Sequence, residues 1–417
     1  MSFTISNKEK QKVGILIHIY RTQKNISQED FLMNVFQEKI CSRQTLSKIE
    51  QGTPIKNDGI YEELLSKINL KFNTDISIEN FFPKDLFQEV LKSCDYYDQN
   101  TLIDLSSTYV EKLLPLKDYV FFHEYYLCFR WIHSYYAHFS LPTPKEANFI
   151  IYLKDSIHPY LYEVMIDLVF KTKVVHADYD FSYFDFKNSN SMINRGNHMM
   201  VLYIQSKLTE MLEYCSVLEK EYIEKDNIVR LLDIYSLKGN GFLETETNKF
   251  YELEHQIKSI VKKNRNRIPE TKISQLHKNL GIQAFRLSLY ETAAHYYELY
   301  IEEKAPYTYI IEVELCISYE YLKQFDKIRA YLSNKDIYTG ENQFQKLLNY
   351  FILKYKYNYT PLQLSSFIVE SVPAIIDETM GKFQQFFYDQ LSNLIDITKH
   401  YKDLKDYLDA TSNTLPI

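Results

Sequence analysis

The chain of 417 residues contains 45% hydrophobic and 25% charged residues, which is an ordinary globular composition. Its length exceeds what one compact core normally accommodates, so we expect at least two domains or an array of repeats. The low content of glycine and proline, 9 and 11 residues, argues against a protein with many tight turns. It favours long helices joined by short loops.

Charge is distributed unevenly along the chain, whose formal net charge is −7. Residues 1–72 carry 11 Lys and Arg against 8 Asp and Glu, whereas the remainder carries 37 basic and 47 acidic residues. A mildly basic segment on an acidic body fits a nucleic-acid-binding segment, because the body alone would be repelled by phosphates.

Aromatic residues are abundant, with 37 Tyr and 26 Phe. They accompany many Asn, Lys and Ile residues, so we interpret them as the product of an AT-rich genome that fills amphipathic positions with aromatic side chains. An aromatic cage for a ligand is the alternative interpretation.

The five cysteines are odd in number, widely spaced and without a CxxC pair. This pattern predicts a reduced, cytoplasmic chain rather than a disulfide framework. The first residues, MSFTISNKEKQKVG, lack an apolar signal core, and no apolar run approaches membrane-spanning length. We therefore expect a cytoplasmic protein that has no membrane partner.

The stretch ICSRQTLSKIEQG at residues 40–52 carries the start and stop signals of a short helix. Ser42 suits the N-cap and Gly52 suits the end of the helix. Leu46 and Ile49, three residues apart, supply a narrow apolar edge. The outward positions are rich in hydrogen-bonding groups, which fits a helix in a DNA major groove, where Arg reads guanine and Gln reads adenine.

Four further helices are predicted around this one. An amphipathic helix covers residues 8–22, and SQEDF begins a second helix, with Ser27 as its N-cap and Asp30 three residues later. A fourth helix follows in IYEELLSKINL, and SIENFF makes a final turn. The sequence therefore predicts five short helices before residue 83.

SQEDF and CSRQTLSKIEQG resemble the helix-turn-helix domain of the Xre/Cro-repressor family, and the resemblance covers residues 8–83. It implies DNA contacts from Gln28, Ser42, Arg43, Gln44, Thr45 and Lys48. Gln28 would bond a phosphate, and Arg43, Gln44, Thr45 and Lys48 would face base edges or phosphates. The connection through VFQEKI is about four residues longer than is usual for the family, which loops tolerate. The alternative is a structural helical subdomain whose Arg43 and Lys48 form a solvated face.

Part of the remaining chain repeats at an offset of 35 residues, where LGIQAFRLSLYETAAHYY (280–297) aligns with LCISYEYLKQFDKIRAYL (315–332). Small or apolar residues recur where two antiparallel helices must approach, and Tyr290 and Phe325 mark the entry of each second helix. These units resemble the tetratricopeptide repeat. We therefore predict an all-α fold, with a five-helix Xre-type helix-turn-helix domain at residues 1–83 and a tetratricopeptide-like helical solenoid at residues 84–417.

Catalytic and metal-binding signals are weak. FFHEYYLC contains His-Glu without the HExxH spacing of zinc proteases, and the scattered glycines form no phosphate-binding loop. We expect no enzymatic activity, no metal and no cofactor.

The whole architecture resembles the Rgg, Rap, NprR, PlcR and PrgX group of peptide-sensing regulators from Gram-positive bacteria. The resemblance implies a homodimeric transcription factor of quorum sensing that binds an inverted-repeat operator in double-stranded DNA. A short signalling peptide bound in the repeat domain would change the spacing of the two DNA-binding domains. The alternatives are a constitutive phage- or plasmid-type repressor and an adaptor that binds a response-regulator protein.

By resemblance to repeat solenoids, one edge of the repeated helices would line a concave surface for the peptide. The residues expected there are Lys278, Asn279, Ile282, Phe285, Val313, Ile317, Glu320 and Asn349. The edge combines apolar contacts with one cation and one anion, and the two Asn side chains suit peptide backbone. The alternative is an ordinary solvated helix face on which Ile282 and Phe285 pack against a neighbour.

Overall fold

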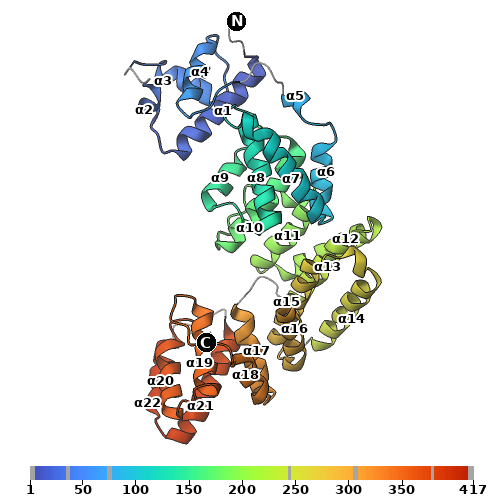
Figure 1. The fold of residues 1–417 in the computed structure, drawn as a ribbon, viewed down its shortest axis with the longest axis vertical. Helices are drawn as coiled ribbons and strands as arrows, with labels where there is room; N and C mark the ends of the chain where they lie inside the picture. The colour runs from blue at the N-terminus through green and yellow to red at the C-terminus, as the bar shows by residue number, and fades with distance from the viewer. Residues whose placement is uncertain are drawn as a thin grey trace. The chain divides into compact units, whose positions relative to one another are not determined.

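The computed structural model describes residues 5–33, 38–72, 78–242, 246–303, 309–376 and 380–411 (Figure 1). Every regular element in these ranges is helical, and the only β-type pairings there are two isolated bridges. The predicted all-α class is confirmed. Two compact units make up the chain, Met1–Arg230 and Leu231–Ile417. The predicted domain boundary after residue 83 stays a prediction.

The first unit begins with the five short helices that the sequence predicts. They are α1 (Asn7–Gln23), α2 (Gln28–Leu32), α3 (Arg43–Glu50), α4 (Asp58–Ser66) and α5 (Ile78–Phe81). The Ser27 hydroxyl accepts a hydrogen bond from the Asp30 amide at 3.1 Å, as its N-cap position predicts. Part of the long VFQEKI connection between α2 and α3 lies outside the described residues.

The rest of the first unit consists of longer helices that pack in pairs. They are α6 (Leu86–Asp95), α7 (Gln99–Leu113), η1 (Leu114–Leu116), α8 (Phe122–His138), α9 (Pro144–Ile151), α10 (Pro159–Val175), η2 (Phe186–Asn188), α11 (Met192–Ile204), α12 (Leu208–Glu224) and the start of α13 (Ile228–Asn240). Helix α7 packs along α8, α9 along α10, and α11 along α12. The core between them is apolar and aromatic.

The first helices share one continuous hydrophobic core with α6–α10. Tyr20 at the end of α1 donates a hydrogen bond to buried Glu124 of α8 at 2.5 Å, and its ring packs on Phe149. The backbone of Lys71 pairs with the segment before α8, accepting from the Val120 amide at 2.8 Å. Helix α1 is therefore fixed to α8 by buried contacts.

The second unit continues with helices in antiparallel pairs. They are the rest of α13, α14 (Thr247–Lys263), η3 (Arg265–Arg267), α15 (Glu270–Arg286), α16 (Tyr290–Glu302), α17 (Tyr309–Tyr321), α18 (Phe325–Leu332), α19 (Gln343–Tyr355), α20 (Pro361–Ser371), α21 (Gly381–Thr398) and α22 (Lys402–Thr411). Each second helix of the predicted repeat begins at the expected aromatic residue, α16 at Tyr290 and α18 at Phe325.

Helices α15 and α16 lie in close contact at Gly281, which belongs to the repeated segment. A Cβ atom at this position would overlap the Tyr297 ring, far inside van der Waals contact. The Tyr297 hydroxyl in turn donates to the carboxyl group of Glu314 on α17. The predicted need for small residues at the helix–helix contact is confirmed at Gly281.

Glu314 is a buried carboxyl group whose titration depends on folding. Burial raises its pKa to about 8, and the hydrogen bond from Tyr297 lowers it only in part. In the unfolded chain the same group titrates near its ordinary value of 4.5. Between these values the folded chain holds a proton that the unfolded chain releases, so stability falls as pH rises through this range.

We predict that Glu314→Gln removes this pH dependence. Between about pH 5 and about pH 8.5, the free energy of unfolding of the wild type should fall by an amount on the order of a few kcal/mol. That of the variant should not show this fall. Urea unfolding followed by circular dichroism measures the difference. Glu291→Gln, an exposed position on α16, is the matched control and should follow the wild type. Parallel pH profiles for wild type and Glu314→Gln would contradict the assignment.

Candidate nucleic-acid interface

The exposed face of α3 carries the candidate DNA contacts. Arg43, Gln44 and Lys48 are exposed, and together with Ser47 they line a shallow depression in the surface. Arg43 makes an exposed ion contact with Glu29 at 3.7 Å. An exposed pair of this kind contributes little free energy, so an incoming phosphate or base can displace it.

Both ends of α3 are fixed by the residues that the sequence indicates. The Ser42 hydroxyl accepts a hydrogen bond from the Thr45 amide at 3.1 Å, and the two hydroxyl oxygens lie 2.9 Å apart. Gly52 follows the helix with a φ of 75°, in the left-handed region that favours glycine. The predicted N-cap and helix end are therefore confirmed.

The inner side of α3 is held by a buried ion pair. Glu50, in its last turn, accepts hydrogen bonds from Arg21 of α1, with Nε at 2.5 Å and a terminal nitrogen at 3.0 Å. Gln28 of α2 donates to the same carboxylate at 2.8 Å. The Gln28 side-chain oxygen then accepts from Arg43 Nε at 3.2 Å. Hydrogen bonds thus connect Arg21 of α1 with Glu50 of α3, Glu50 with Gln28 of α2, and Gln28 with the exposed guanidinium of Arg43.

The surroundings of Glu50 favour its ionised form. Burial acts to raise its pKa, but the hydrogen bonds from Arg21 and Gln28 and the positive charge of Arg21 outweigh burial, so the pKa lies below its ordinary value. The ion pair therefore persists at neutral pH.

Helices α1 and α3 touch backbone to backbone at Gly14. A Cβ atom there would overlap the carbonyl oxygen of Ile49 and stand 2.9 Å from its carbonyl carbon. Glycine is therefore required in the middle of α1, although it lowers helix propensity. Any larger residue must push α3 away from α1.

The structure places the predicted DNA-contact residues in two groups. Arg43, Gln44 and Lys48 share the exposed face, and Thr45 is half-buried beside the Ser42 cap. Gln28 is half-buried and bonded within the Glu50 network rather than projecting to solvent. The DNA contacts themselves stay a prediction.

Three supporting residues escaped the sequence analysis: Gly14, Arg21 and Glu50. A glycine inside an amphipathic helix marks Gly14, and a glutamate in the last turn of a short helix marks Glu50, whereas Arg21 carries no distinctive local signal. Neither signal identifies its partner, because the contacts join residues that are far apart in the sequence.

Most of the predicted peptide-contact residues are buried within the second unit. Phe285, Val313, Ile317, Glu320 and Asn349 are buried, whereas Lys278, Asn279 and Ile282 are half-buried.

Two of these polar side chains already have partners. Glu320 accepts hydrogen bonds from Lys354 and Tyr355, and Asn349 bonds both the amide and the carbonyl of Tyr338 at 2.8 Å. The packing of Phe285 near Phe383, with ring centroids 6.0 Å apart, agrees with the alternative of a packed helix face. Peptide contact at this edge stays a prediction.

No protein-family model, curated protein or solved structure matches the chain. Within the ranges that the structure describes, no group of three His, Cys, Asp or Glu side chains is arranged to hold a metal ion. None of the helices in the same ranges combines the length and apolar character that a bilayer-spanning segment requires.

We predict that Gly14→Ala displaces α3 and destabilises the first unit by about 1–3 kcal/mol, because the added methyl group meets backbone atoms. Gly196→Ala in the middle of α11 is the matched control, since a Cβ atom there would meet only the Tyr222 hydroxyl at 3.9 Å. That control should stabilise by roughly 0.5–1 kcal/mol through helix propensity. Urea unfolding and hydrogen exchange of α3 amides measure both. Equal effects of the two substitutions would refute the close contact.

Proposed function

We propose that the chain is a DNA-binding transcriptional regulator that inserts α3 into a major groove. The observation that carries the proposal is the exposed set Arg43, Gln44 and Lys48 on a short helix whose opposite side is fixed by a buried ion pair. Arg and Gln are the side chains that read guanine and adenine through paired hydrogen bonds. The basic excess of residues 1–72 supports approach to phosphates.

The contacts support a division of roles among these residues. Arg43 and Gln44 lie in the first turn of α3, the part of a recognition helix that reaches base edges. Lys48 lies one turn later and suits a phosphate. Gln28, bonded to both Glu50 and Arg43, contributes by orienting the Arg43 guanidinium.

The proposal includes control by a ligand of the repeat region, such as a short signalling peptide. The 35-residue repeat and its matching helix pairs α15–α16 and α17–α18 support a tetratricopeptide-like unit. A ligand switches DNA binding only if it prefers one arrangement of the chain. Within the first unit, the hydrogen bond from Tyr20 to Glu124 joins α1 to the helices that follow it.

We predict that selection from random DNA duplexes with the wild-type chain enriches one sequence. Arg43→Ala or Gln44→Ala should weaken binding of the chain to that sequence by about 1–3 kcal/mol and relax the preference at one base pair. Lys48→Ala should weaken all duplexes alike and flatten the dependence on salt. Lys220→Ala, an exposed position on α12, is the control and should bind as the wild type. Fluorescence anisotropy over a salt series measures each. Unchanged affinity and preference in Arg43→Ala would exclude this docking.

We also predict that the full chain is a homodimer and that the selected duplex is an inverted repeat. One α3 helix reads only a few base pairs, so useful specificity requires two half-sites related by the two-fold axis of the dimer. Sedimentation equilibrium of the full chain at micromolar concentration gives the mass, and footprinting gives the half-site spacing. A monomer that binds a single half-site would contradict this part of the proposal.

A further inference from the structure

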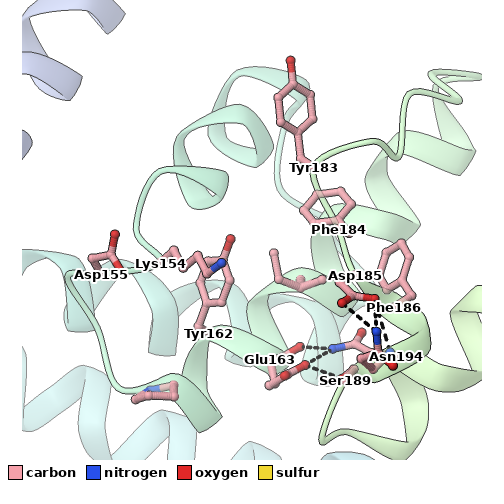
Figure 2. A pocket seen from close by; sticks show the side chains of 13 residues that line it. Lys154, Asp155, Tyr162, Glu163, Tyr183, Phe184, Asp185, Phe186, Ser189 and Asn194 are labelled. Atoms are coloured by element: carbon pink, nitrogen blue, oxygen red, sulfur yellow. Dashed lines mark hydrogen bonds between the residues drawn. The ribbon is translucent and has the colours of Figure 1, made fainter.

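The first unit contains a cavity of about 370 Å³ that plays no part in the α3 interface. Helix α10, the turn before it, the segment around η2 and the start of α11 form its walls (Figure 2). Its volume lies within the range of pockets that hold small molecules.

The lining combines aromatic rings with an excess of negative charge. Tyr162, Tyr183, Phe184 and Phe186 supply the rings. The charged residues are the carboxylates Asp155, Glu163 and Asp185 and a single cation, Lys154. Figure 2 shows Lys154, Asp155 and Tyr162 toward one end and Asp185 and Phe186 toward the other.

The carboxylate of Glu163 is held in place by buried or half-buried partners. Its Oε2 atom accepts hydrogen bonds from Ser189 Oγ at 2.6 Å and from Asn194 Nδ2 at 2.7 Å. Asn194 is fully buried and also donates to the Glu163 carbonyl at 2.8 Å. Both side-chain bonds fall on Oε2, so Oε1 keeps its capacity to accept from a ligand.

The other two carboxylates, Asp185 and Asp155, differ in the hydrogen bonds that they make. Asp185 caps η2 by accepting from the Asn188 amide at 3.4 Å and from its side-chain nitrogen at 2.9 Å. Asp155 is exposed and makes no hydrogen bond or ion pair with the residues that the structure describes. Asp155 and Glu163 are therefore the acceptors available to a bound group.

The pKa of the Tyr162 hydroxyl depends on the burial and the charges inside the cavity. Burial raises the pKa of its hydroxyl to about 12, and the negative charges of Asp155 and Glu163 add to the increase. The protonated hydroxyl donates to the Ile151 carbonyl at 3.1 Å. Burial alone disfavours any charged group, but the negative charges of Asp155 and Glu163 oppose a phenolate and attract a cation. The aromatic faces of the lining attract a cation further.

We propose that this cavity binds a small organic cation, an amine or a guanidinium carried on an apolar or aromatic body. The cationic group lies against Glu163 Oε1, where charge-assisted hydrogen bonds form, and Asp155 adds negative charge from the end of the cavity marked by Lys154 and Tyr162. The body of the ligand packs among Tyr162, Phe184 and Phe186. This binding site is independent of the DNA contacts proposed for α3.

The first test compares probes that differ only in charge. Calorimetry on the full chain with phenethylamine, phenylethyl alcohol and phenylacetate varies the charge on a phenyl body, and phenethylguanidine supplies a guanidinium on the same body. We expect the two cations to bind one per chain, and the alcohol and the acid to bind at least about tenfold more weakly. Equal affinity for amine and alcohol, or no binding of either cation at millimolar concentration, would overturn the proposal.

The second test uses variants that should change the affinity for phenethylamine in opposite directions. Asp155→Asn, which breaks no hydrogen bond, and Glu163→Gln should each weaken phenethylamine binding several-fold, whereas Lys154→Met should tighten it by removing the competing cation. Asp104→Asn, an exposed carboxylate on α7, is the control and should bind as the wild type. Melting curves establish that each variant is folded. Unchanged affinity in both Asp155→Asn and Lys154→Met would place the amine elsewhere.

Discussion

The buried ion pair between Arg21 and Glu50 determines where the exposed face of α3 points. It joins the last turn of α1 to the last turn of α3, and Gln28 adds a third hydrogen-bonding partner from α2. Removing one partner of a buried pair leaves an uncompensated charge and typically costs about 3–5 kcal/mol. Three helices therefore depend on one carboxylate, and the Arg43 guanidinium is attached to the same network through Gln28.

A second constraint links these helices to the rest of the first unit. Gly14 in the middle of α1 lets this helix lie directly against α3, and Tyr20 in its last turn donates a hydrogen bond to Glu124 in the core of α8. Helix α1 thus contacts α3 with one part and α8 with another. A movement of α8 that shifts α1 must also shift α3, because no flexible side chain intervenes at Gly14. This is a continuous packed connection of the kind that energetic coupling requires.

Local signals in the sequence predict the helices and their ends, whereas contacts between distant residues leave no such signal. The five N-terminal helices, the Ser42 cap, the left-handed Gly52 and the start of α16 at Tyr290 all follow from residues within one or two turns. The partner of Glu50 lies 29 positions away.

Neither the cavity of the first unit nor the burial of the expected peptide edge could be predicted from the sequence, because both depend on contacts between distant residues. The cavity gathers residues from positions 154 to 194, and no periodic pattern marks its walls. The predicted peptide edge rests on two aligned units and on their resemblance to repeat solenoids. Val313 and Ile317 are buried, however, and α17, which carries them, packs against α16, α18 and α19. Two aligned units do not reveal how many neighbouring helices cover each of their faces.

The many tyrosines acquire a physical role in the structure beyond filling amphipathic positions. Tyrosine hydroxyls donate to buried or half-buried carboxyl groups in Tyr20–Glu124, Tyr296–Glu254, Tyr297–Glu314, Tyr319–Glu298, Tyr331–Glu312 and Tyr355–Glu320. A buried carboxyl group is costly unless it is hydrogen-bonded, and a phenol provides a donor at the end of a ring that packs like an apolar side chain.

In the second unit, these pairs join α14 to α16, α16 to α17, α17 to α18 and α17 to α19. An apolar contact between helices tolerates sliding, whereas a hydrogen bond between two buried groups holds one register. Movement between these helices must therefore break a tyrosine–glutamate bond or carry both partners together. The lysines beside Glu312 and Glu320 strengthen the same restraint, because Lys335, in the segment that follows α18, and Lys354 of α19 bond these carboxylates.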